Sequence, residues 1–354
     1  MYLSVDIKKK LQKFSLNINF ELTGGTLALL GESGCGKTIT LRCIAGLVKP
    51  DEGRIILNDR VLFDSEKGIN LSIQKRKVGF LFQNYALFPH MTVEENIGYG
   101  LKGLNKVEKN KIIDAVLEIT QLSELKKSYP HQISGGQQQR IALARALAVN
   151  PEILMLDEPF SALDNHLRNL MIKHMKEILE NYNGPTIFVT HNMEEAYSLC
   201  TDTVIIEKGR SIQQGTTKDI FRKPNSVTSA KVTGCKNISN VQRLSDNTLM
   251  ATQWNCKINF REPINQQIKH IAIRAHYIYF QEEVTIENSY QCWPVFTSEK
   301  PFGTIVYLKL HEKPIDSEDY NLQWDITSKE WDRIKDKPLP WKIGFDEKDL
   351  ILIE

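Results

Sequence analysis

Eight consecutive residues near the start of the chain have the spacing of a phosphate-binding loop. They fit the pattern G-x-x-x-x-G-K-[ST] and are Gly31, Glu32, Ser33, Gly34, Cys35, Gly36, Lys37 and Thr38. Glycines let backbone N–H groups curve around phosphates, and a helix that begins here adds its positive end. Lys37 would neutralise the β- and γ-phosphates of a nucleotide, and the Thr38 hydroxyl would bind Mg²⁺. The loop lies between an apolar run and a helix-like stretch, which argues against a chance match.

Polar residues with useful chemistry follow three further apolar runs. Gln83 follows the first of these runs, Asp157 and Glu158 follow the second, and His191 follows the third. Short apolar runs without alternation are typical of parallel strands buried on both faces, and ligands bind beyond the carboxyl ends of such strands. Asp157 suits a carboxylate that holds Mg²⁺, and Glu158 could orient or deprotonate a water molecule. Taken alone, such an acidic pair is more often a turn or helix cap, and a histidine at a strand end is more often structural. The runs are Thr26–Leu30 before the phosphate loop, then Val78–Phe82, Ile153–Leu156 and Thr186–Thr190.

A second glycine motif begins another helix-like stretch. It comprises Ser134, Gly135, Gly136, Gln137 and Gln138. Ser134 suits a helix N-cap, and the first turn of the helix would then offer a second anion site. The alternative is an ordinary serine cap with a flexible entry.

The composition describes a folded protein with a balanced surface charge. The 354 residues suggest about two domains, and 41% of them are apolar. The formal net charge of +2 gives no reason to expect nucleic-acid binding. The six cysteines form no CxxC pair, so we expect free thiols in a reducing compartment. We expect no signal peptide and no membrane-spanning segment, since no apolar run approaches 18 residues. A membrane role would therefore depend on a partner.

The chain divides into two parts that differ in their sequence patterns. The first 230 residues alternate strand-like and helix-like stretches, which predicts an α/β domain with a parallel sheet. Between Glu94 and Leu147 the pattern is helical. Beyond a boundary at about residues 225–236 the segments are short and rich in aromatic residues, which predicts a small β-barrel or sandwich. The strands expected there are Ile271–Phe280, Thr304–Leu310 and Leu350–Ile353.

Taken together, these motifs resemble the ATP-binding cassette ATPases of ABC transporters. The resemblance covers residues 1–230 and rests on ISGGQQQR, ILMLDEP, SALD and THNMEEA in that order. It implies an α/β P-loop NTPase with an inserted helical subdomain at about residues 84–150. It also implies a small β-rich accessory domain, similar to OB or TOBE domains, over residues 231–354. The expected reaction is ATP hydrolysis with ATP and Mg²⁺ as cofactors.

The resemblance also implies roles for individual residues. Gly31–Thr38 would be the Walker A loop, and residues 134–138 the signature motif, with Ile133 where leucine is usual. A homodimer is expected, with each ATP between the Walker A loop of one subunit and the signature motif of the other. The remaining roles are the Mg²⁺-contacting Q-loop glutamine for Gln83, the Walker B aspartate for Asp157, the catalytic glutamate for Glu158, the D-loop for Ser161–Asp164 with Asp164, and the switch histidine for His191.

Two residues near the expected nucleotide site have unusual positions, Leu11 and Cys35. The family usually stacks an aromatic residue on adenine, and Leu11 aligns with that position here. Phe14 is close by, but with Leu16 it forms an alternating strand pair that we expect to face the core. Cys35 lies inside the phosphate loop, where the helix end and Lys37 are expected to lower the pKa of its thiol and make it reactive.

The resemblance further suggests an importer. Tyr85–Thr92 would pack against a membrane permease, although Phe88 and Met91 could instead be core residues of the helical subdomain. Val61–Leu71 is most similar to the molybdate and tungstate subgroup, so molybdate or a similar oxyanion is the expected cargo. Sulfate, ferric iron, polyamine or sugar importers are the alternatives, and a soluble cassette ATPase or a non-hydrolysing ATP-binding protein are alternatives of other classes. A periplasmic or lipid-anchored binding protein would take part indirectly, and the chain would lie peripherally at the cytoplasmic face of the membrane.

The second domain gives a weaker signal. Ile271–His276 resembles a strand motif of the accessory domains attached to such ATPases. In molybdate relatives a domain here binds the oxyanion, but the basic residues of this sequence are scattered and predict no oxyanion pocket. A structural or regulatory role in dimerisation is therefore expected.

Overall fold

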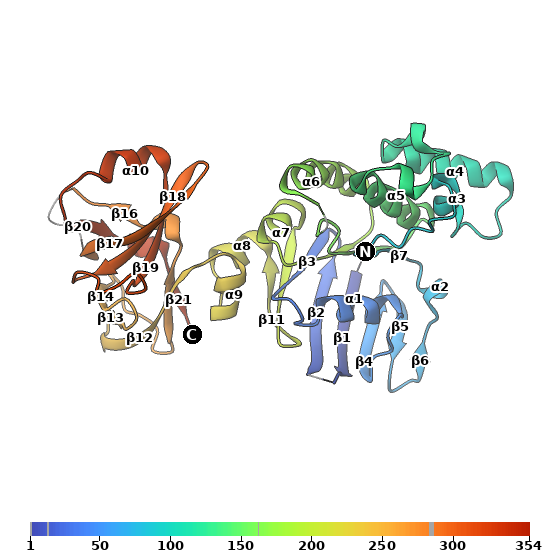
Figure 1. Cartoon of the computed structure of the whole chain (residues 1–354). Coiled ribbons are helices and arrows are strands. Elements are labelled where there is room, and N and C mark those ends of the chain that lie inside the picture. The colour runs from blue at the N-terminus through green and yellow to red at the C-terminus, as the bar shows by residue number, and fades with distance from the viewer. Residues whose placement is uncertain (1, 13, 162, 283–286) are drawn as a thin grey trace. The chain divides into compact units, whose positions relative to one another are not determined.

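The computed structural model describes residues 2–12, 14–161, 163–282 and 287–354. The chain forms two compact units, Met1–Ile220 and Phe221–Glu354 (Figure 1). The division falls earlier than the expected boundary at residue 230. The reason lies in helix α9 (Val227–Val232), since Ala230 packs in a small cluster with Ala272 and other residues of the second unit.

One large sheet organises the first unit. Its strand order is β6-β5-β4-β1-β2-β11-β10-β3-β9-β8-β7. The section from β10 to β7 pairs in parallel, whereas β1, β2, β4, β5 and β6 pair with antiparallel partners within their group. The expected parallel sheet is thereby confirmed, and the four apolar runs form neighbouring strands. The strands are β1 (Tyr2–Lys10), β2 (Ser15–Thr23), β3 (Thr26–Leu30), β4 (Glu52–Leu57), β5 (Arg60–Asp64), β6 (Ile69–Asn70), β7 (Val78–Leu81), β8 (Ile153–Asp157), β9 (Thr186–Thr190), β10 (Asp202–Glu207) and β11 (Arg210–Thr216).

Burial explains why three of these strands lack alternation. Every residue of β3, β8 and β9 is buried, because both faces of this part of the sheet are covered. By contrast, β2 alternates strictly between buried and exposed residues, as a strand with one solvent face does.

A helical subdomain follows β7 in the sequence. Helices α3, α4 and α5 share an apolar cluster that includes Ile97, Leu117 and Ile141, and they group together in Figure 1. Each begins at a capping box, with Thr92, Asn105 and Ser134 as the N-caps. The helices of the first unit are α1 (Lys37–Ala45), α2 (Ile73–Arg76), α3 (Val93–Gly98), α4 (Lys106–Ile119), α5 (Gly135–Ala148), α6 (Asn165–Glu180) and α7 (Met193–Leu199), and the division between the units falls within α8 (Thr217–Arg222).

Two five-stranded sheets build the second unit, which confirms a β-rich domain. Their orders are β14-β13-β12-β15-β21 and β16-β20-β17-β18-β19, and both contribute to one core that contains Trp254 and Trp341. The expected strand Ile271–Phe280 is interrupted by a 3-10 turn, η3 (Ala275–Tyr277). The strands are β12 (Asn237–Ser245), β13 (Thr248–Ala251), β14 (Cys256–Asn259), β15 (His270–Ile273), β16 (Tyr279–Phe280), β17 (Ser289–Lys300), β18 (Gly303–Leu310), β19 (Leu322–Thr327), β20 (Trp341–Gly344) and β21 (Leu350–Ile353), with α10 (Ser328–Ile334) and η4 (Glu347–Asp349) between them.

Within the described ranges, none of the helices combines the length and the apolar character needed to span a membrane.

Candidate active site

The phosphate loop connects β3 to α1 and wraps around its own lysine. Gly34 and Gly36 have positive φ angles of 79° and 114°, which suit glycine and let the loop turn sharply. The Lys37 ammonium donates hydrogen bonds to the carbonyl oxygens of Gly31 and Glu32, at 2.8 and 2.9 Å. Only 4% of Lys37 is exposed, so its charge is held at the centre of the loop. The loop is therefore organised around a fixed positive charge.

A hydroxyl and a carboxylate meet beside this loop. Thr38 Oγ1 donates a hydrogen bond of 2.8 Å to Asp157 Oδ1, which joins the start of α1 to the end of β8. Burial raises the pKa of Asp157, and the hydrogen bond from Thr38 opposes that effect. Hydroxyl and carboxylate oxygens are the ligands that Mg²⁺ prefers in proteins. The two side chains thus fit the metal-binding role that the sequence suggested.

Glu158 is the centre of a second polar group at the same edge of the sheet. Its Oε2 accepts a hydrogen bond of 3.4 Å from Gln83 Nε2 and lies 3.4 Å from His191 Nδ1. These side chains follow β7, β8 and β9, which are adjacent strands. The structure therefore brings Gln83, Glu158 and His191 together, while their roles in catalysis stay predictions.

The backbone fixes where Glu158 points. Its φ angle is 45°, an uncommon value for a residue with a side chain. Its N–H donates to the carbonyl of Val189 at 3.0 Å, and Ser161 Oγ donates to its carbonyl at 3.0 Å. These bonds hold the turn after β8, so the carboxylate faces the cleft of the phosphate loop.

That cleft has a volume of about 190 Å³. Leu11 lines it, as the alignment with the adenine position suggested. Phe14 lines it as well, and it also packs against the apolar core cluster that contains Leu16, as expected. It stands immediately before β2, half-buried between that core and the cleft. The lining residues are Leu11, Phe14, Gly34, Gly36, Lys37, Thr38, Ile39 and Glu158.

A smaller cleft of about 60 Å³ opens on the other side of Glu158. It contains Glu195, a buried carboxylate that is not among the candidate residues expected from the sequence motifs. Glu195 Oε2 accepts a hydrogen bond of 2.6 Å from Thr190 Oγ1, and burial raises the pKa of Glu195. The sequence signal was available, since Glu195 lies four residues after His191 on the same helix-like stretch. The cleft is lined by Glu158, Ser161, Arg168, Thr190, His191, Asn192 and Glu195.

The second glycine motif forms the first turn of α5. Ser134 Oγ accepts from the Gln137 N–H at 3.3 Å, and Gln137 Oε1 accepts from the Ser134 N–H at 2.9 Å. Gln138 Nε2 donates to the Pro130 carbonyl at 2.9 Å. Among the described residues that line the two clefts, none comes from residues 134–138. Within a single chain, this motif therefore lines neither cleft.

Asp164 caps helix α6. Its Oδ1 accepts a hydrogen bond of 3.0 Å from the Leu167 N–H, so the expected D-loop ends in an ordinary N-cap. Of this expected loop, Ala162 lies outside the described residues.

Hydrogen bonds from two side chains of the helical subdomain brace the backbone of the segment from Tyr85 to Thr92. The Arg145 guanidinium donates to the Tyr85 and Ala86 carbonyls at 2.8 and 2.7 Å. The fully buried Asn96 amide donates to the Phe88 and Met91 carbonyls, both at 3.1 Å. Tyr85 is buried and Phe88 is half-buried, whereas Pro89 and His90 are exposed. The bracing presents a fixed, partly apolar surface to solvent.

Cys35 does not have the environment that the sequence suggested. Burial raises the pKa of its thiol, and the nearby Lys37 charge opposes this with a smaller effect. Cys35 as a whole is only 7% exposed. The expectation of a lowered pKa is wrong, because removal of the thiolate from water outweighs the attraction of one ammonium.

Comparison with known proteins gives a consistent result for the first unit. A family model described as ABC transporter matches residues 12–161. An Fe(3+) ions import ATP-binding protein of Haemophilus influenzae is 42% identical over 262 residues, which cover 73% of this chain and 72% of that protein. A sulfate/thiosulfate import ATP-binding protein of Agrobacterium fabrum is 47% identical over 226 residues, with 62% of this chain and 63% of that protein covered. These names support the ferric iron and sulfate alternatives better than the expected molybdate.

Two solved structures share the fold of the first unit. One is a subunit from Clostridium perfringens described as part of an ABC transporter complex, with a TM-score of 0.56, 29% identity and coverage of 62% of this chain and 90% of that chain. The other is a dimeric ATP-binding cassette in a post-hydrolysis state with ADP and Pi bound. Its TM-score is 0.52 and its identity 27%, with 61% of this chain and 99% of that chain covered.

Proposed function

Because this chain belongs to the ABC transporter family as an ATP-binding import subunit that hydrolyses ATP, we propose that it supplies the energy for uptake of ferric ions. One observation carries this choice of cargo. The alignment with the ferric ion importer subunit covers 73% of the chain, whereas the first unit ends at residue 220 of 354, so the similarity continues into the second unit. Sulfate or thiosulfate is the second candidate, on the higher identity of 47% to an importer subunit of that kind.

The proposed hydrolysis uses the side chains around Glu158. Lys37 and the loop N–H groups would hold the phosphates, and Glu158 would accept a proton from the attacking water. Gln83 and His191, each 3.4 Å from Glu158 Oε2, would orient that water and contact the γ-phosphate. Pre-oriented groups of this kind lower the barrier because little reorganisation is needed when charge develops.

Thr38 and Asp157 would hold Mg²⁺, and Gln83, which hydrogen-bonds the adjacent Glu158, would be a further ligand. The 2.8 Å separation of the Thr38 and Asp157 oxygens supports this assignment, since one cation can contact both. When bound, Mg²⁺ neutralises charge on the phosphates. The chain's own part is to place these oxygens, with the Thr38 hydrogen bond opposing the rise in the Asp157 pKa that burial causes.

We further propose that the complete site forms between two copies of this chain. Residues 134–138 begin α5, and their helix terminus would meet the γ-phosphate bound by the other copy. The absence of these residues from the described lining of the clefts supports a contribution in trans. The second unit would assist dimerisation or regulation.

The braced segment Tyr85–Thr92 is the proposed contact with a membrane permease at the cytoplasmic face. The half-buried Phe88 ring would supply the apolar contact. Phe88→Ala should leave the ATPase activity of the isolated protein unchanged but reduce co-purification with the permease. Phe296→Ala, a half-exposed phenylalanine of the second unit, is a matched control that should leave co-purification intact.

The cargo can be tested by deletion of the gene in its host, followed by uptake measurements with labelled ferric citrate, sulfate and molybdate. The proposal expects ferric uptake to fall and to recover with the wild-type gene but not with a Glu158→Gln copy. A loss of sulfate uptake alone would favour the second candidate. A loss of molybdate uptake alone would restore the interpretation drawn from Val61–Leu71. The ATPase assignment survives each of these outcomes, because the cassette does not contact the cargo.

A further inference from the structure

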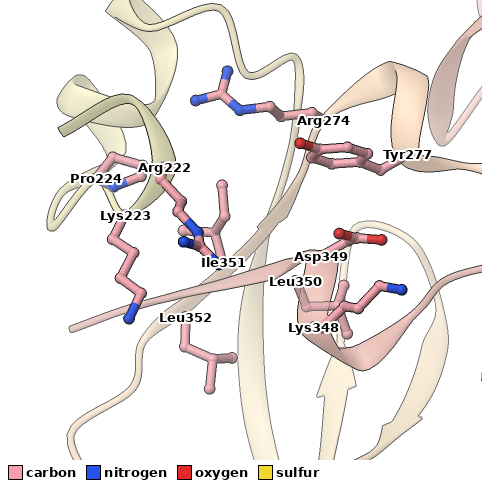
Figure 2. Close-up of a pocket in the computed structure, with 10 residues that line it drawn as sticks. All are labelled: Arg222, Lys223, Pro224, Arg274, Tyr277, Lys348, Asp349, Leu350, Ile351 and Leu352. Carbon is pink, nitrogen blue, oxygen red and sulfur yellow. The ribbon is translucent and has the colours of Figure 1, made fainter. Parts of the chain in front are cut away.

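A pocket in the second unit gathers residues from segments that are far apart in the sequence. It has a volume of about 770 Å³ (Figure 2). Its walls come from the end of α8 and the connection to α9, from the region of β15 and η3, and from η4 with β21. The lining residues are Arg222, Lys223, Pro224, Arg274, Tyr277, Lys348, Asp349, Leu350, Ile351 and Leu352. The basic residues that looked scattered in the sequence are therefore partly brought together by the fold.

One side of the pocket is positively charged. Arg222 is the last residue of α8 and Lys223 follows it; both are exposed, and Figure 2 shows their side chains on the same side as Ile351 and Leu352. Cations that converge on a concave surface concentrate the potential there, since the protein walls polarise less than water.

Arg274 adds a third cation whose position is fixed. Its Nη1 donates a hydrogen bond of 2.6 Å to the Thr233 carbonyl, and its Nη2 donates to the Phe221 carbonyl. It is half-buried, so its charge is less hydrated than that of a surface arginine. Both bonds go to neutral backbone carbonyl oxygens, so neither one pairs the guanidinium with a carboxylate.

Negative charge in the pocket is limited. Asp349 is the carboxylate among the lining residues, and Figure 2 shows it near Tyr277, away from Lys223. Lys348 is partly neutralised, because its ammonium lies 3.0 Å from Asp346 Oδ2. Basic residues therefore outnumber acidic ones in the lining, with Arg222, Lys223, Arg274 and Lys348 against Asp349.

The rest of the lining is apolar or aromatic. Pro224 is buried, Leu350 to Leu352 are half-buried, and Tyr277 is 42% exposed. Pockets for small organic ligands usually measure about 300–1,000 Å³ and combine apolar walls with a few polar groups. An inorganic oxyanion would leave most of this volume and the whole aliphatic wall without contact.

We propose that this pocket binds an organic anion, a molecule with a phosphate or carboxylate group on an apolar or aromatic body. The anionic group pairs with Arg222 and Lys223, and Arg274 adds to the positive potential. The body covers Ile351, Leu352 and Tyr277. The site shares no residue with the nucleotide cleft, and the proposal does not depend on which ion is transported.

Phenyl phosphate and inorganic phosphate are suitable probes, because they share the anionic group and differ in the aromatic body. The full chain, saturated with Mg·ADP so that the phosphate loop is filled, is titrated with each probe by calorimetry. Phenyl phosphate should bind at least about tenfold more tightly than inorganic phosphate, since it buries a ring. Its affinity should fall as the salt concentration rises.

Variants separate the two halves of the pocket. The double substitution Arg222→Ala with Lys223→Ala should weaken phenyl phosphate by at least about tenfold, through the loss of charge-assisted hydrogen bonds. Tyr277→Ser should weaken phenyl phosphate and leave inorganic phosphate unchanged. Lys329→Ala removes an exposed cation of the same unit outside the pocket and should change neither. All four positions are exposed, and unchanged thermal unfolding checks that each variant folds.

Three results would overturn the proposal. The first is the absence of phenyl phosphate binding at about 10 mM, a concentration well above a dissociation constant of about 1 mM. The second is equal affinity for the two probes, which would remove the organic body from the recognised class. The third is an equal effect of the Arg222 and Lys223 double substitution and of Lys329→Ala, which would indicate nonspecific attraction to surface charge.

Discussion

The Arg168 guanidinium lies beside the buried carboxylate of Glu195, with Nε 3.5 Å from Oε1. Arg168 belongs to α6, which follows Glu158 in the sequence, and Glu195 belongs to α7, which follows His191. The ion pair thus joins the two segments that carry the candidate base and the candidate switch residue. This position suggests that the ion pair holds Glu158 and His191 in place relative to each other.

Removal of the cation from this pair should destabilise the first unit. Arg168→Met leaves a buried carboxylate without its partner, and we expect the free energy of unfolding to fall by about 3 kcal/mol. Urea titration measures this, with Lys176→Met, an exposed position on the same helix, as the control. Burial raises the pKa of Glu195, so the folded chain binds that proton more tightly than the unfolded chain. The loss of unfolding free energy caused by Arg168→Met should therefore be smaller at pH 5 than at pH 8. An equal loss at both pH values would contradict this account.

Replacement of the candidate base should separate binding from turnover. Glu158→Gln keeps the size of the side chain but removes the group that accepts a proton from water. We expect ATP hydrolysis to fall at least about 100-fold while ATP still binds. Chromatography with Mg·ATP should show an ATP-bound dimer, and Glu180→Gln on α6 should behave as wild type. A monomeric Glu158→Gln protein with full hydrolysis would remove Glu158 from this role.

Asp157→Asn should affect stability and metal dependence in opposite directions. Burial raises the pKa of Asp157 above its usual value of 3.8, so its contribution to stability is present below that pH and is lost as the pH rises. The neutral amide avoids this cost and still accepts the Thr38 hydrogen bond. Without nucleotide the variant should melt no lower than wild type at pH 7. With ATP it should lose the extra stability that Mg²⁺ gives, and a retained Mg²⁺ effect would argue against Asp157 as a ligand.

Cys35 should react slowly although it lies in the phosphate loop. Burial raises the pKa of this thiol above 9.0, so little thiolate exists at pH 7.5. Iodoacetamide at that pH should leave Cys35 mostly unmodified by mass spectrometry and the ATPase activity close to that of Cys35→Ser. Modification should accelerate above pH 9. Rapid loss of activity at pH 7.5, prevented by ATP and absent from Cys35→Ser, would refute this prediction.

Phe14 should contribute more to ATP affinity than Leu11. Both line the cleft, but only the aromatic ring can stack on adenine. Loss of a base-stacking ring costs about 1–3 kcal/mol, so Phe14→Ala should raise KM for ATP roughly tenfold with little change in kcat. Leu11→Ala should have a smaller effect. The reverse order in steady-state kinetics would return the adenine contact to Leu11.

The sequence determined the fold class and most of the candidate site. The phosphate loop, the Asp157–Glu158 pair and Ser134 are local patterns, because their geometry depends on a turn, a strand end or a helix cap within a few residues. Buried parallel strands can also be recognised in the sequence, as apolar runs that end in polar residues. The runs do not specify the order of these strands; the structure places β3, β9, β8 and β7 side by side, which brings Gln83, Glu158 and His191 to one edge.

The tertiary structure alone decided features that depend on distant residues or on burial. Glu195 forms its ion pair with Arg168, which belongs to another helix. The pKa of the Cys35 thiol depends on how far packing excludes water from it. The basic pocket joins Arg222 to Ile351 across more than a hundred residues of sequence. Periodicity reports which face of an element is buried, but not which distant side chain lies opposite. Charge recognition depends on the distance between groups in space, and only the folded chain sets that distance.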